Sequence, residues 1–543
     1  MKVPAAIAEI LKREGVDIVF GYPRNSVLEA AAEADVRTVI VRQERTGVHM
    51  ADAYSRLTRG RKMGVFVMQH GPGTENAYGG IAQAYSESIP VLVIPHGYAR
   101  RLAHVPDNYN ATVSMAGISK SAEPILVAAE TPNILRRAFT RLRNGRPRPA
   151  IVELPYDMVG EEVPEPLAYE PVAATRFAPD PDAVAAAARA LVEAKRPVIY
   201  AGQGVHWAEA YDELRRLAEL LAAPVCTSLE GKSAFDETHP LALGSGGAAV
   251  PAAVRHFLDR ADIIFGVGCS FSETPFGVAM PRGRLMVHNT LDEGDINKAY
   301  PTRHPLLGDA RLTLAMLIDA CAALIGTAAR DRGPVEREIR DVEGEWMKQW
   351  LPILTSDEVP LTPYRVLWEL QQTVDKAGTI ITHDAGSPRD QLSPFWKSTA
   401  PLSYIGWGKT TQLGYGLGLA MGARLACPDK LCINVWGDAA IGFTGMDFET
   451  AVRERIPILS ILLNNASMAI ELDIMPVATR KYQATDISGH YADFARALGG
   501  YGERITRPED IAPAIRRGIE QTQRGVPALL EFITSQEQRF SRL

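Results

Sequence analysis

The sequence predicts an α/β protein built from three doubly wound parallel-sheet domains. Short runs of β-branched and apolar residues alternate with helical stretches along the chain, which is the pattern of parallel strands joined by crossover helices. The length of 543 residues exceeds what one hydrophobic core organises, and it predicts about three domains. Two proline- and charge-rich segments, residues 160–182 and 327–363, interrupt the alternation and predict linkers.

These linkers divide the chain into predicted domains of residues 1–165, 180–325 and 360–543. The first and third domains share a pattern. Residues 71–94 and 437–463 each run from a glycine-rich turn through a helix to Ile-Pro and an apolar strand. Any strand–helix–strand unit follows this order, so the likeness is a hint of two related domains flanking a third.

The composition excludes several classes of protein. A net charge of −6 provides no basic face for nucleic acid. No run of about 18 apolar residues is present, so no membrane span is predicted. The N-terminal segment is a charged amphipathic helix and does not resemble a signal peptide. The five cysteines are scattered without a CxxC pair, which favours free thiols and a cytoplasmic protein.

The first predicted domain places polar residues where its strands end. A strand over residues 36–42 stops just before Glu44, which opens a helix, and "GVFVMQH" ends at Gln69 and His70. Ligands of parallel sheets bind at the carboxyl ends of the strands, so these residues are candidates for a site. Glu44 also fits an acid that complements a helix dipole, and His70 fits a histidine bound by loop carbonyls.

The middle predicted domain has glycine-containing turns after strands, in "PVIYAGQGV" and "ADIIFGVGC". Gly202 and Gly204 could admit a nucleotide phosphate. The third glycine and the later acid of a dinucleotide motif are missing, so a tight turn is the favoured interpretation and a nucleotide site is the alternative.

The third predicted domain places an acid and two amides after apolar strands. Asp438 follows "KLCINVW", and Asn464-Asn465 follow "IPILSILL". A right-handed crossover through the intervening helix makes these strands parallel, so the polar side chains meet at one sheet edge. Carboxylate and amide oxygens suit Mg²⁺, which usually shares phosphate oxygens of a ligand, and the N–H groups of Ala439 and Ala440 would meet a diphosphate. An N-capping Asp and a turn-forming Asn pair are the structural alternative.

This Gly-Asp…Asn-Asn pattern resembles the cofactor motif of thiamine-diphosphate-dependent enzymes, including its spacing. The family has glycine where Ala439 stands, a position at a helix start that need not require positive φ. The resemblance implies cofactor contacts from Gly437, Asp438, Ala439, Ala440 and Asn465. It also implies that Mg²⁺ is held by the side chains of Asp438 and Asn465 and the backbone carbonyl of Ser467.

Three further stretches extend the resemblance. "RQERTGVHMADAYSRLTRG" is similar to a segment of the acetohydroxyacid (acetolactate) synthases, the branch this chain resembles most over its length. The likeness implies that Glu44 binds the aminopyrimidine ring of the cofactor and relays a proton. "HDAGS" and "QLGYGLGLAMGARLA" resemble cofactor segments and imply contacts from Gly386, Ser387 and Leu413. Leu413 stands where the synthases commonly have methionine, and it also fits a simple core residue.

The resemblance implies an enzyme that makes or breaks a C–C bond next to a carbonyl, by 2-oxo acid decarboxylation or carboligation. The substrate side differs from the synthases. Residues 107–121 lack their Phe-Gln-Glu segment, and "GCSFSET" replaces the "GARFDDR" of flavin-binding synthases, so FAD or another nucleotide in the middle domain stays open. "NNASMAIE" ends in a glutamate as in pyruvate-decarboxylase-like enzymes. The candidate catalytic residues are Glu44, Gln69, His70, Glu471 and Asn25.

The expected substrate is a small 2-oxo acid, an aldehyde or an acyl-CoA, with no nucleic-acid or membrane partner. Enzymes that resemble oxalyl-CoA decarboxylase or 2-hydroxyacyl-CoA lyase are the alternative, with a nucleotide in the middle domain. An inert cofactor-binding paralogue is a further alternative, although Glu44 and Asp438 are both present. Sites of the family take the glutamate from one subunit and the metal motif from another, so a homodimer or homotetramer is expected.

Overall fold

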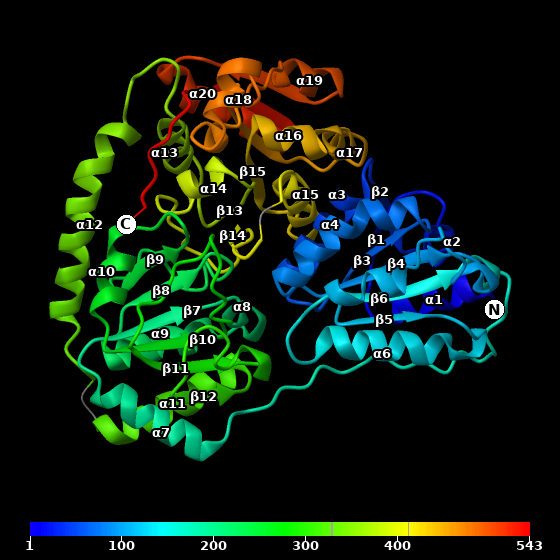
Figure 1. The fold of residues 1–543 in the computed structure, drawn as a ribbon, viewed down its shortest axis with the longest axis horizontal. Helices are drawn as coiled ribbons and strands as arrows, with labels where there is room; N and C mark the ends of the chain where they lie inside the picture. The colour runs from blue at the N-terminus through cyan, green and yellow to red at the C-terminus, as the bar shows by residue number, and fades with distance from the viewer. Residues whose placement is uncertain (327–328, 411, 543) are drawn as a thin grey trace.

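The computed structural model describes residues 1–326, 329–410 and 412–542 and contains three six-stranded sheets in which all paired strands are parallel. Figure 1 shows the N-terminal domain beside the other two, with the C-terminal domain above the middle domain. The predicted α/β class with three doubly wound domains is confirmed. None of the described helices is both long and apolar enough to cross a membrane.

The N-terminal sheet has the strand order β2-β1-β3-β4-β6-β5. Its central strand β3 is buried along its whole length, as expected for a strand covered by helices on both faces. Its strands are β1 (Ile18–Gly21), β2 (Arg37–Ile40), β3 (Gly64–Met68), β4 (Val91–Gly97), β5 (Ser121–Pro124) and β6 (Ala150–Pro155). Its helices are α1 (Val3–Arg13), α2 (Ser26–Glu33), α3 (Glu44–Leu57), α4 (Pro72–Ser86), α5 (Ala111–Ser114) and α6 (Thr131–Arg143).

The C-terminal sheet has the order β14-β13-β15-β16-β18-β17, which repeats the N-terminal order strand for strand. Its strands are β13 (Thr379–His383), β14 (Tyr404–Ile405), β15 (Leu431–Gly437), β16 (Leu459–Asn464), β17 (Tyr501–Ile505) and β18 (Ala528–Ile533). Its helices are α13 (Pro363–Thr373), α14 (Ser387–Leu392), α15 (Tyr415–Ala426), α16 (Asp438–Thr444), α17 (Phe448–Arg453), α18 (Pro476–Tyr482), α19 (Tyr491–Ala497) and α20 (Ile511–Gln523). The sequence likeness between the two domains therefore reflects equivalent positions, since β3–α4–β4 corresponds to β15–α16–β16.

The middle sheet has a different order, β12-β11-β10-β7-β8-β9. Its strands are β7 (Pro197–Ala201), β8 (Val225–Ser228), β9 (Ala242–Gly246), β10 (Ile263–Val267), β11 (Leu285–Thr290) and β12 (His304–Leu307). Its helices are α7 (Pro181–Glu193), α8 (Gly204–Ala208), α9 (Tyr211–Leu221), α10 (Ala252–Arg260) and α11 (Ala310–Ile325). β7 and β10 lie side by side at the centre, and the chain leaves them in opposite directions across the sheet. A crevice opens at such a switch point.

The second predicted linker contains a long helix. Residues 327 and 328 lie outside the described residues, and α12 (Gly333–Leu354) follows along the edge of the molecule in Figure 1. Ile339, Trp346, Trp350 and Leu354 are buried at a spacing of seven and then four residues, which is one face of a helix. Trp346 stacks on Phe395 with ring centroids 4.9 Å apart, so the linker is anchored to the C-terminal domain.

The N- and C-terminal domains meet through α3 and α15, whose buried residues belong to one shared core. Glycines on α15 allow the two backbones to approach closely. A methyl group on Gly422 would lie 2.3 Å from the Met50 carbonyl oxygen of α3, and one on Gly418 would lie 2.5 Å from Cβ of His49. Side chains larger than hydrogen are therefore excluded at this contact.

Replacing Gly422 by alanine is expected to destabilise the protein by about 1–3 kcal/mol, because α3 must move away from α15. Gly344→Ala on α12 is the matched control. A methyl group there meets no atom within 4 Å, and the change should stabilise the helix by up to about 1 kcal/mol. Chemical denaturation of both variants measures the difference. Equal effects at the two positions would contradict the close contact.

Glu153 on β6 predicts a pH dependence of stability. It is 4% exposed, has no ion-pair partner among the described residues, and burial raises its pKa to about 7. A folded-state pKa above the unfolded value gives stability that is present in acid and is lost as the pH rises toward 7. The loss between the two pKa values is about 3 kcal/mol relative to Glu153→Gln. Chemical denaturation of the wild type and of Glu153→Gln at several pH values tests this prediction. Unfolding free energies that change in parallel with pH in the two proteins would refute it.

Candidate active site

Most of the cofactor residues expected in the C-terminal domain follow three neighbouring strands. β13 pairs with β15, and β15 pairs with β16, so their carboxyl ends lie together at one edge. Gly437 at the end of β15 is in register with Leu463 near the end of β16. The parallel pairing brings Asp438 and Asn465 together, and the Asn465 N–H donates to Oδ2 of Asp438 over 3.1 Å.

The three expected metal ligands belong to residues that hydrogen bonds link to one another. Asn465 Oδ1 accepts a hydrogen bond from the Ser467 N–H at 3.0 Å, which folds the chain so that Ser467 returns toward Asp438. The backbone carbonyl of Ser467 accepts no hydrogen bond from a described residue. The buried side-chain Oγ of Ser467 has no hydrogen-bond partner among these residues either. A carboxylate, an amide oxygen and a free carbonyl are the hard donors that Mg²⁺ prefers. Among the described residues, no group of three His, Cys, Asp or Glu side chains offers another metal site.

The environment of Asp438 favours a nearby cation. The side chain is 4% exposed, and desolvation raises its pKa, while hydrogen bonds from the backbone N–H groups of Ala439, Asn465, Ala466 and Ser467 lower it. A divalent cation beside the carboxylate would offset the cost of burying its charge. The residues present therefore fit the metal.

The turn after β13 leaves room for a ligand. Gly386 has φ +84°, a conformation that disfavours residues with a side chain, and a methyl group there would meet nothing nearer than 3.9 Å. The atoms closest to that point belong to Ile470 and Pro388, so the turn faces residues 465–471 after β16, which we call the metal loop. Ser387 is half-buried at the start of α14. The open turn fits the diphosphate side of the expected cofactor.

Asp384 connects this turn to the segment that carries Leu413. Its carboxylate accepts hydrogen bonds from Gly414 and Gly416, each at 2.9 Å, and from Ala385 at 2.8 Å. Burial raises its pKa to about 6, and these bonds oppose the rise. Asp384 lies in the "HDAGS" stretch, but no role was assigned to it from the sequence. An acid directly after a buried strand was the available signal.

Leu413 lies in the turn before α15, half-buried against the core shared by the N- and C-terminal domains. Both expected roles, packing and cofactor contact, remain compatible with this position. Glu471 is half-buried in a short 3₁₀ turn at the end of the metal loop, and its carboxylate forms no hydrogen bond or ion pair with a described residue. The polar C-terminal tail crosses this loop, because Gln538 donates to the Ala469 carbonyl at 2.9 Å.

Glu44 is buried at the start of α3, 3% exposed, beside the first turn of α4. The Asn76 amide donates to its Oε2 at 3.2 Å. Gly73 lies between Glu44 and Gln69, since a methyl group there would be 3.4 Å from Oε1 of Glu44 and 2.9 Å from Cγ of Gln69. Asn76, in the "GPGTEN" stretch, is a site residue that sequence reasoning missed. We call Glu44, Gln69, Gly73 and Asn76 the Glu44 cluster.

The pKa of Glu44 is raised by burial, while its hydrogen bonds to its own N–H and to Asn76 lower it. Asp447 of the same chain adds a smaller repulsion. Asp447 follows α16 and accepts a hydrogen bond from the Arg42 N–H at 2.7 Å. It lies nine residues beyond Asp438, in a 3₁₀ turn past the end of α16. Within the described chain, no hydrogen bond or ion pair connects the Glu44 cluster to Asp438 or Asn465.

His70 lies in an aromatic cluster at the carboxyl edge of the N-terminal sheet. Its ring packs edge-on against Tyr98 and Tyr156, with centroids 4.7 and 4.8 Å apart. Burial and the nearby Arg24 lower its pKa, so the ring is neutral at neutral pH. Its buried Nδ1 has no hydrogen-bond partner among the described residues. The ring can therefore offer one nitrogen to a ligand.

Asn25 is used within the fold. Its Nδ2 donates to the carbonyls of Met68 and Ile94 at 2.8 and 2.9 Å, and its Oδ1 caps α2 through the Val27 N–H. Both donor positions of the amide are therefore occupied, by the end of β3 and the middle of β4. This hydrogen bonding is that of a residue that holds two strands together, and it leaves no N–H for a substrate.

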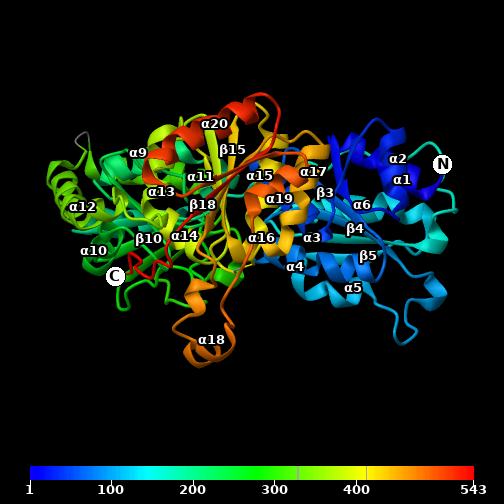
Figure 2. The ribbon, with the colours of Figure 1, turned by 90° about the horizontal axis from the view of Figure 1, so that it is seen from above.

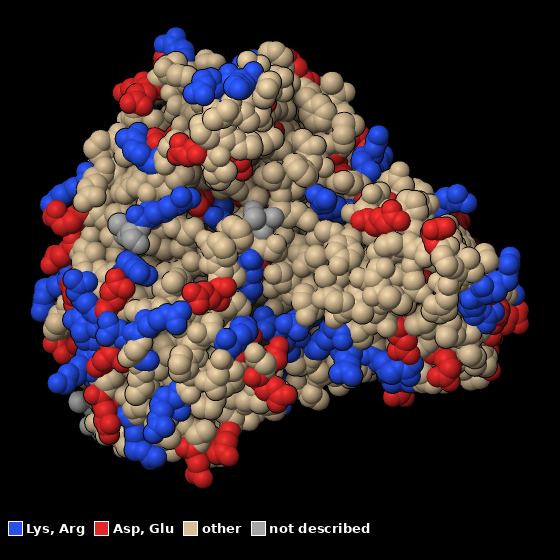
Figure 3. Space-filling view, in the orientation of Figure 1, with Lys and Arg blue, Asp and Glu red and all other residues tan. Residues whose placement is uncertain are grey.

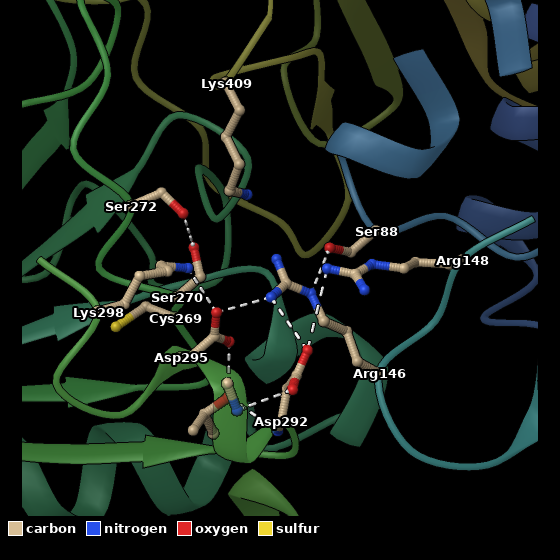
Figure 4. A network of polar contacts seen from close by, with 12 residues as sticks. Ser88, Arg146, Arg148, Cys269, Ser270, Ser272, Asp292, Asp295, Lys298 and Lys409 are labelled. Atoms are coloured by element: carbon tan, nitrogen blue, oxygen red, sulfur yellow. Dashed lines mark hydrogen bonds and ion pairs between the residues drawn. The ribbon is translucent and has the colours of Figure 1, made fainter. Parts of the chain in front are cut away.

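A cavity of about 520 Å³ opens at the carboxyl edge of the middle sheet. Gly202 and Gly204 line it after β7, and Gly268 to Ser272 line it after β10. Figure 4 shows its wall, where Arg146 reaches from the N-terminal domain to Asp295 at 2.7 Å. Burial opposes the ionisation of Asp295, but Arg146 and Lys298 hold its pKa below the usual value. Six Arg and Lys side chains line the cavity: Arg59, Arg61, Arg143, Arg146, Arg176 and Lys409.

Comparison with known proteins assigns each of the three domains. Models of thiamine pyrophosphate enzymes match residues 1–122 as the N-terminal TPP binding domain, 184–317 as the central domain and 384–532 as the C-terminal TPP binding domain.

Three relatives are similar over nearly the whole chain. The acetolactate synthase large subunit of Parasynechococcus marenigrum is 31% identical, covering 94% of this chain and 85% of its own. A probable acetolactate synthase large subunit of Methanocaldococcus jannaschii is 29% identical, covering 98% and 92%. The glyoxylate carboligase of Escherichia coli O157:H7 is 26% identical, covering 98% and 93%.

Proposed function

Because the chain belongs to the thiamine pyrophosphate enzymes, in the branch of the acetolactate synthases, we propose that it joins 2-oxo acids by carboligation with thiamine diphosphate and Mg²⁺. The observation that carries the proposal is the convergence of Asp438, Asn465 and the Ser467 carbonyl beside the open Gly386 turn. The relatives named as synthases and as a carboligase favour this reaction over the acyl-CoA alternative.

In this proposal the C-terminal domain binds the phosphate end of the cofactor through the metal. Asp438, Asn465 and Ser467 would hold Mg²⁺, the Gly386 turn with Ser387 would accommodate the diphosphate, and Leu413 would support the rings. Further contacts would come from Gly437, Ala439 and Ala440. Bound thiamine diphosphate supplies a carbon nucleophile that adds to the carbonyl carbon of a 2-oxo acid.

Glu44 would hold a proton at a carboxyl oxygen that faces the aminopyrimidine ring. Its burial raises the pKa, so the carboxyl holds a proton more readily than an exposed glutamate does. Asn76 orients the carboxyl by donating to Oε2 and leaves Oε1 on the side of Gly73. Gln69 and His70 would face the substrate from the same domain, and Glu471 would face it from the metal loop.

We infer that the active site forms between two copies of the chain, as a homodimer or a tetramer of such dimers. The Glu44 cluster lies toward the far end of α16 from Asp438 within one chain, so a second copy is needed to bring them together. Figure 3 shows a broad uncharged area on the N-terminal domain and its junction with the C-terminal domain. Tyr78 on α4, Phe443 on α16 and Met446 just after α16 are 39%, 49% and 48% exposed, as expected for an interface. Figure 2 shows α18 projecting from the C-terminal domain.

Mixing two inactive variants tests the shared site. Glu44→Gln and Asp438→Ala homodimers should each be inactive, because every site lacks one residue. After unfolding or subunit exchange, a mixed dimer has one site with both residues intact and one with neither. About a quarter of the wild-type activity is expected from random pairing. Activity that never exceeds the sum of the two variants would contradict a site between chains.

We propose that the middle-domain cavity holds a nucleotide, with its diphosphate near the six basic side chains. The cavity adjoins the Gly202-Gln203-Gly204 turn, where the sequence left a nucleotide site open. The visible absorbance of the purified protein distinguishes a bound flavin from a colourless nucleotide. Release of neither on denaturation would refute the proposal.

The assignment of the reaction is tested by supplying thiamine diphosphate, Mg²⁺ and single 2-oxo acids, such as pyruvate or glyoxylate, and measuring both CO₂ release and carboligation products. We expect CO₂ release together with a hydroxy-oxo acid product. CO₂ release with only an aldehyde product would identify a decarboxylase. Turnover of an acyl-CoA with no turnover of 2-oxo acids would favour the alternative class.

A further inference from the structure

The segment that carries Leu413 is held by charged residues from the other two domains. Residues 406–410 and 412–413, which we call the Trp407 loop, lead from β14 into α15. Glu87 at the end of α4 accepts hydrogen bonds from the Gly408 N–H at 3.1 Å and the Lys409 N–H at 2.9 Å, one on each carboxylate oxygen. The Lys409 ammonium in turn forms an ion pair with Glu230 of the middle domain.

The groups around Glu87 are buried and mostly charged. Glu87 itself is fully buried, and the charged side chains that face it are Arg56 from α3, Lys409 and Glu230. Tyr415 of α15 also faces it and binds Arg56, whose Nη1 donates to the Gly406 carbonyl at 2.7 Å. Glu87 and Arg56 together fix three backbone groups of the Trp407 loop from the N-terminal domain.

We propose that Glu87 is a positioning residue for the thiamine site, which in its ionised form holds the Trp407 loop and thereby places Leu413 against the cofactor. The proposal rests on the proposed binding of thiamine diphosphate. Lys409 and Glu230 also line the middle-domain cavity, so the junction joins that cavity to the cofactor segment. Figure 4 shows Lys409 reaching toward the cavity from the side opposite Arg146.

Protonation of Glu87 should weaken its hydrogen bonds to the Trp407 loop. An ionised carboxylate accepts both N–H groups strongly, whereas a neutral carboxyl has one hydroxyl oxygen, which is a poor acceptor. Burial raises the pKa of Glu87 to about 7, with Lys409 and Arg56 opposing the rise and Glu230 adding to it. The group therefore changes charge near neutral pH. Cofactor affinity should fall as the pH drops through this range.

The test compares Glu87→Gln with Glu153→Gln by equilibrium dialysis of thiamine diphosphate and Mg²⁺ into the whole protein. Glutamine at position 87 accepts only one of the two N–H bonds at any pH. We expect about a 10-fold lower affinity at about pH 8 and a flattened pH dependence. Glu153 is also buried, its pKa is likewise raised to about 7, and it makes no hydrogen bond or ion pair to the Trp407 loop within the described chain, so Glu153→Gln should keep the wild-type profile.

Two more variants distinguish positioning from a general loss of structure. Glu230→Gln removes the carboxylate that raises the pKa of Glu87, so the midpoint of the affinity profile should move to lower pH. Lys409→Met removes the cation that lowers it, so the midpoint should move to higher pH. These opposite shifts remain measurable if Glu87→Gln does not fold. Unchanged midpoints, or a Glu153→Gln profile as flat as that of Glu87→Gln, would overturn the inference. Failure of the wild type to bind thiamine diphosphate would instead overturn the proposed function.

Discussion

Glu44→Gln is expected to lower kcat by about 1000-fold or more, while Mg²⁺-dependent binding of thiamine diphosphate stays close to that of the wild type. Glutamine has nearly the same shape and can keep the contact with Asn76, but its amide cannot relay a proton. General acid–base groups contribute about 10²–10⁴-fold to rates, so this loss lies within their range. Buried Glu44 touches none of the expected metal ligands in its own chain, which is why binding should survive.

Steady-state kinetics and equilibrium dialysis on the same preparation measure the two quantities separately. Glu33→Gln is the control, since Glu33 is exposed at the end of α2 and lies outside the Glu44 cluster. It should leave kcat within about twofold, as expected for a surface substitution. Retention of wild-type turnover by Glu44→Gln would refute the proton relay. Loss of cofactor binding together with turnover would indicate a structural role.

Asp438→Ala is expected to weaken cofactor binding at least about 100-fold and to remove its dependence on Mg²⁺, because the only carboxylate among the three expected ligands is lost. The change also removes the acceptor for the N–H groups of Ala439 and Asn465. Asp438→Asn keeps the shape and an acceptor oxygen, so it separates the loss of charge from a loosened loop. Its binding should also be weaker than that of the wild type.

Asp429→Ala is the control for this pair, because Asp429 is exposed and precedes β15 at the opposite edge of the same sheet. Titration of Mg²⁺ at fixed thiamine diphosphate gives the metal dependence directly. Binding by Asp438→Ala that is as tight and as metal-dependent as that of the wild type would refute the metal assignment. Equal weakening in the control would point to global instability.

The fold class was predictable because periodicity is local. Alternating strands and helices are visible in any stretch of the chain, and the right-handed crossover rule alone places Asp438 beside Asn465. The linker helix α12 was missed because proline and charge dominate its composition, whereas its buried face consists of only a few residues. One of these, Trp346, is buried against Phe395 of a different domain. Local composition cannot show that contact.

The roles of individual candidate residues also depend on contacts that the local sequence does not show. Asn25 was a catalytic candidate by sequence, and its amide binds the end of β3 and the middle of β4, which are far from it along the chain. Asp384 received no role by sequence, although it holds both the turn after β13 and the start of α15. Hydrogen bonds between distant segments decide such roles, and residue type alone does not.

The sequence by itself determined the α/β class, the resemblance to thiamine-diphosphate enzymes, and the residues that a cofactor site of this kind requires. Strand–helix–strand spacing and short motifs encode these features within a few tens of residues. Only the tertiary structure decided that Glu44 lies toward the far end of α16 from Asp438, and that Glu87, Lys409 and Glu230 meet where three domains join. The physical reason is that burial and charge pairing depend on segments hundreds of residues apart, which become neighbours only when the domains pack.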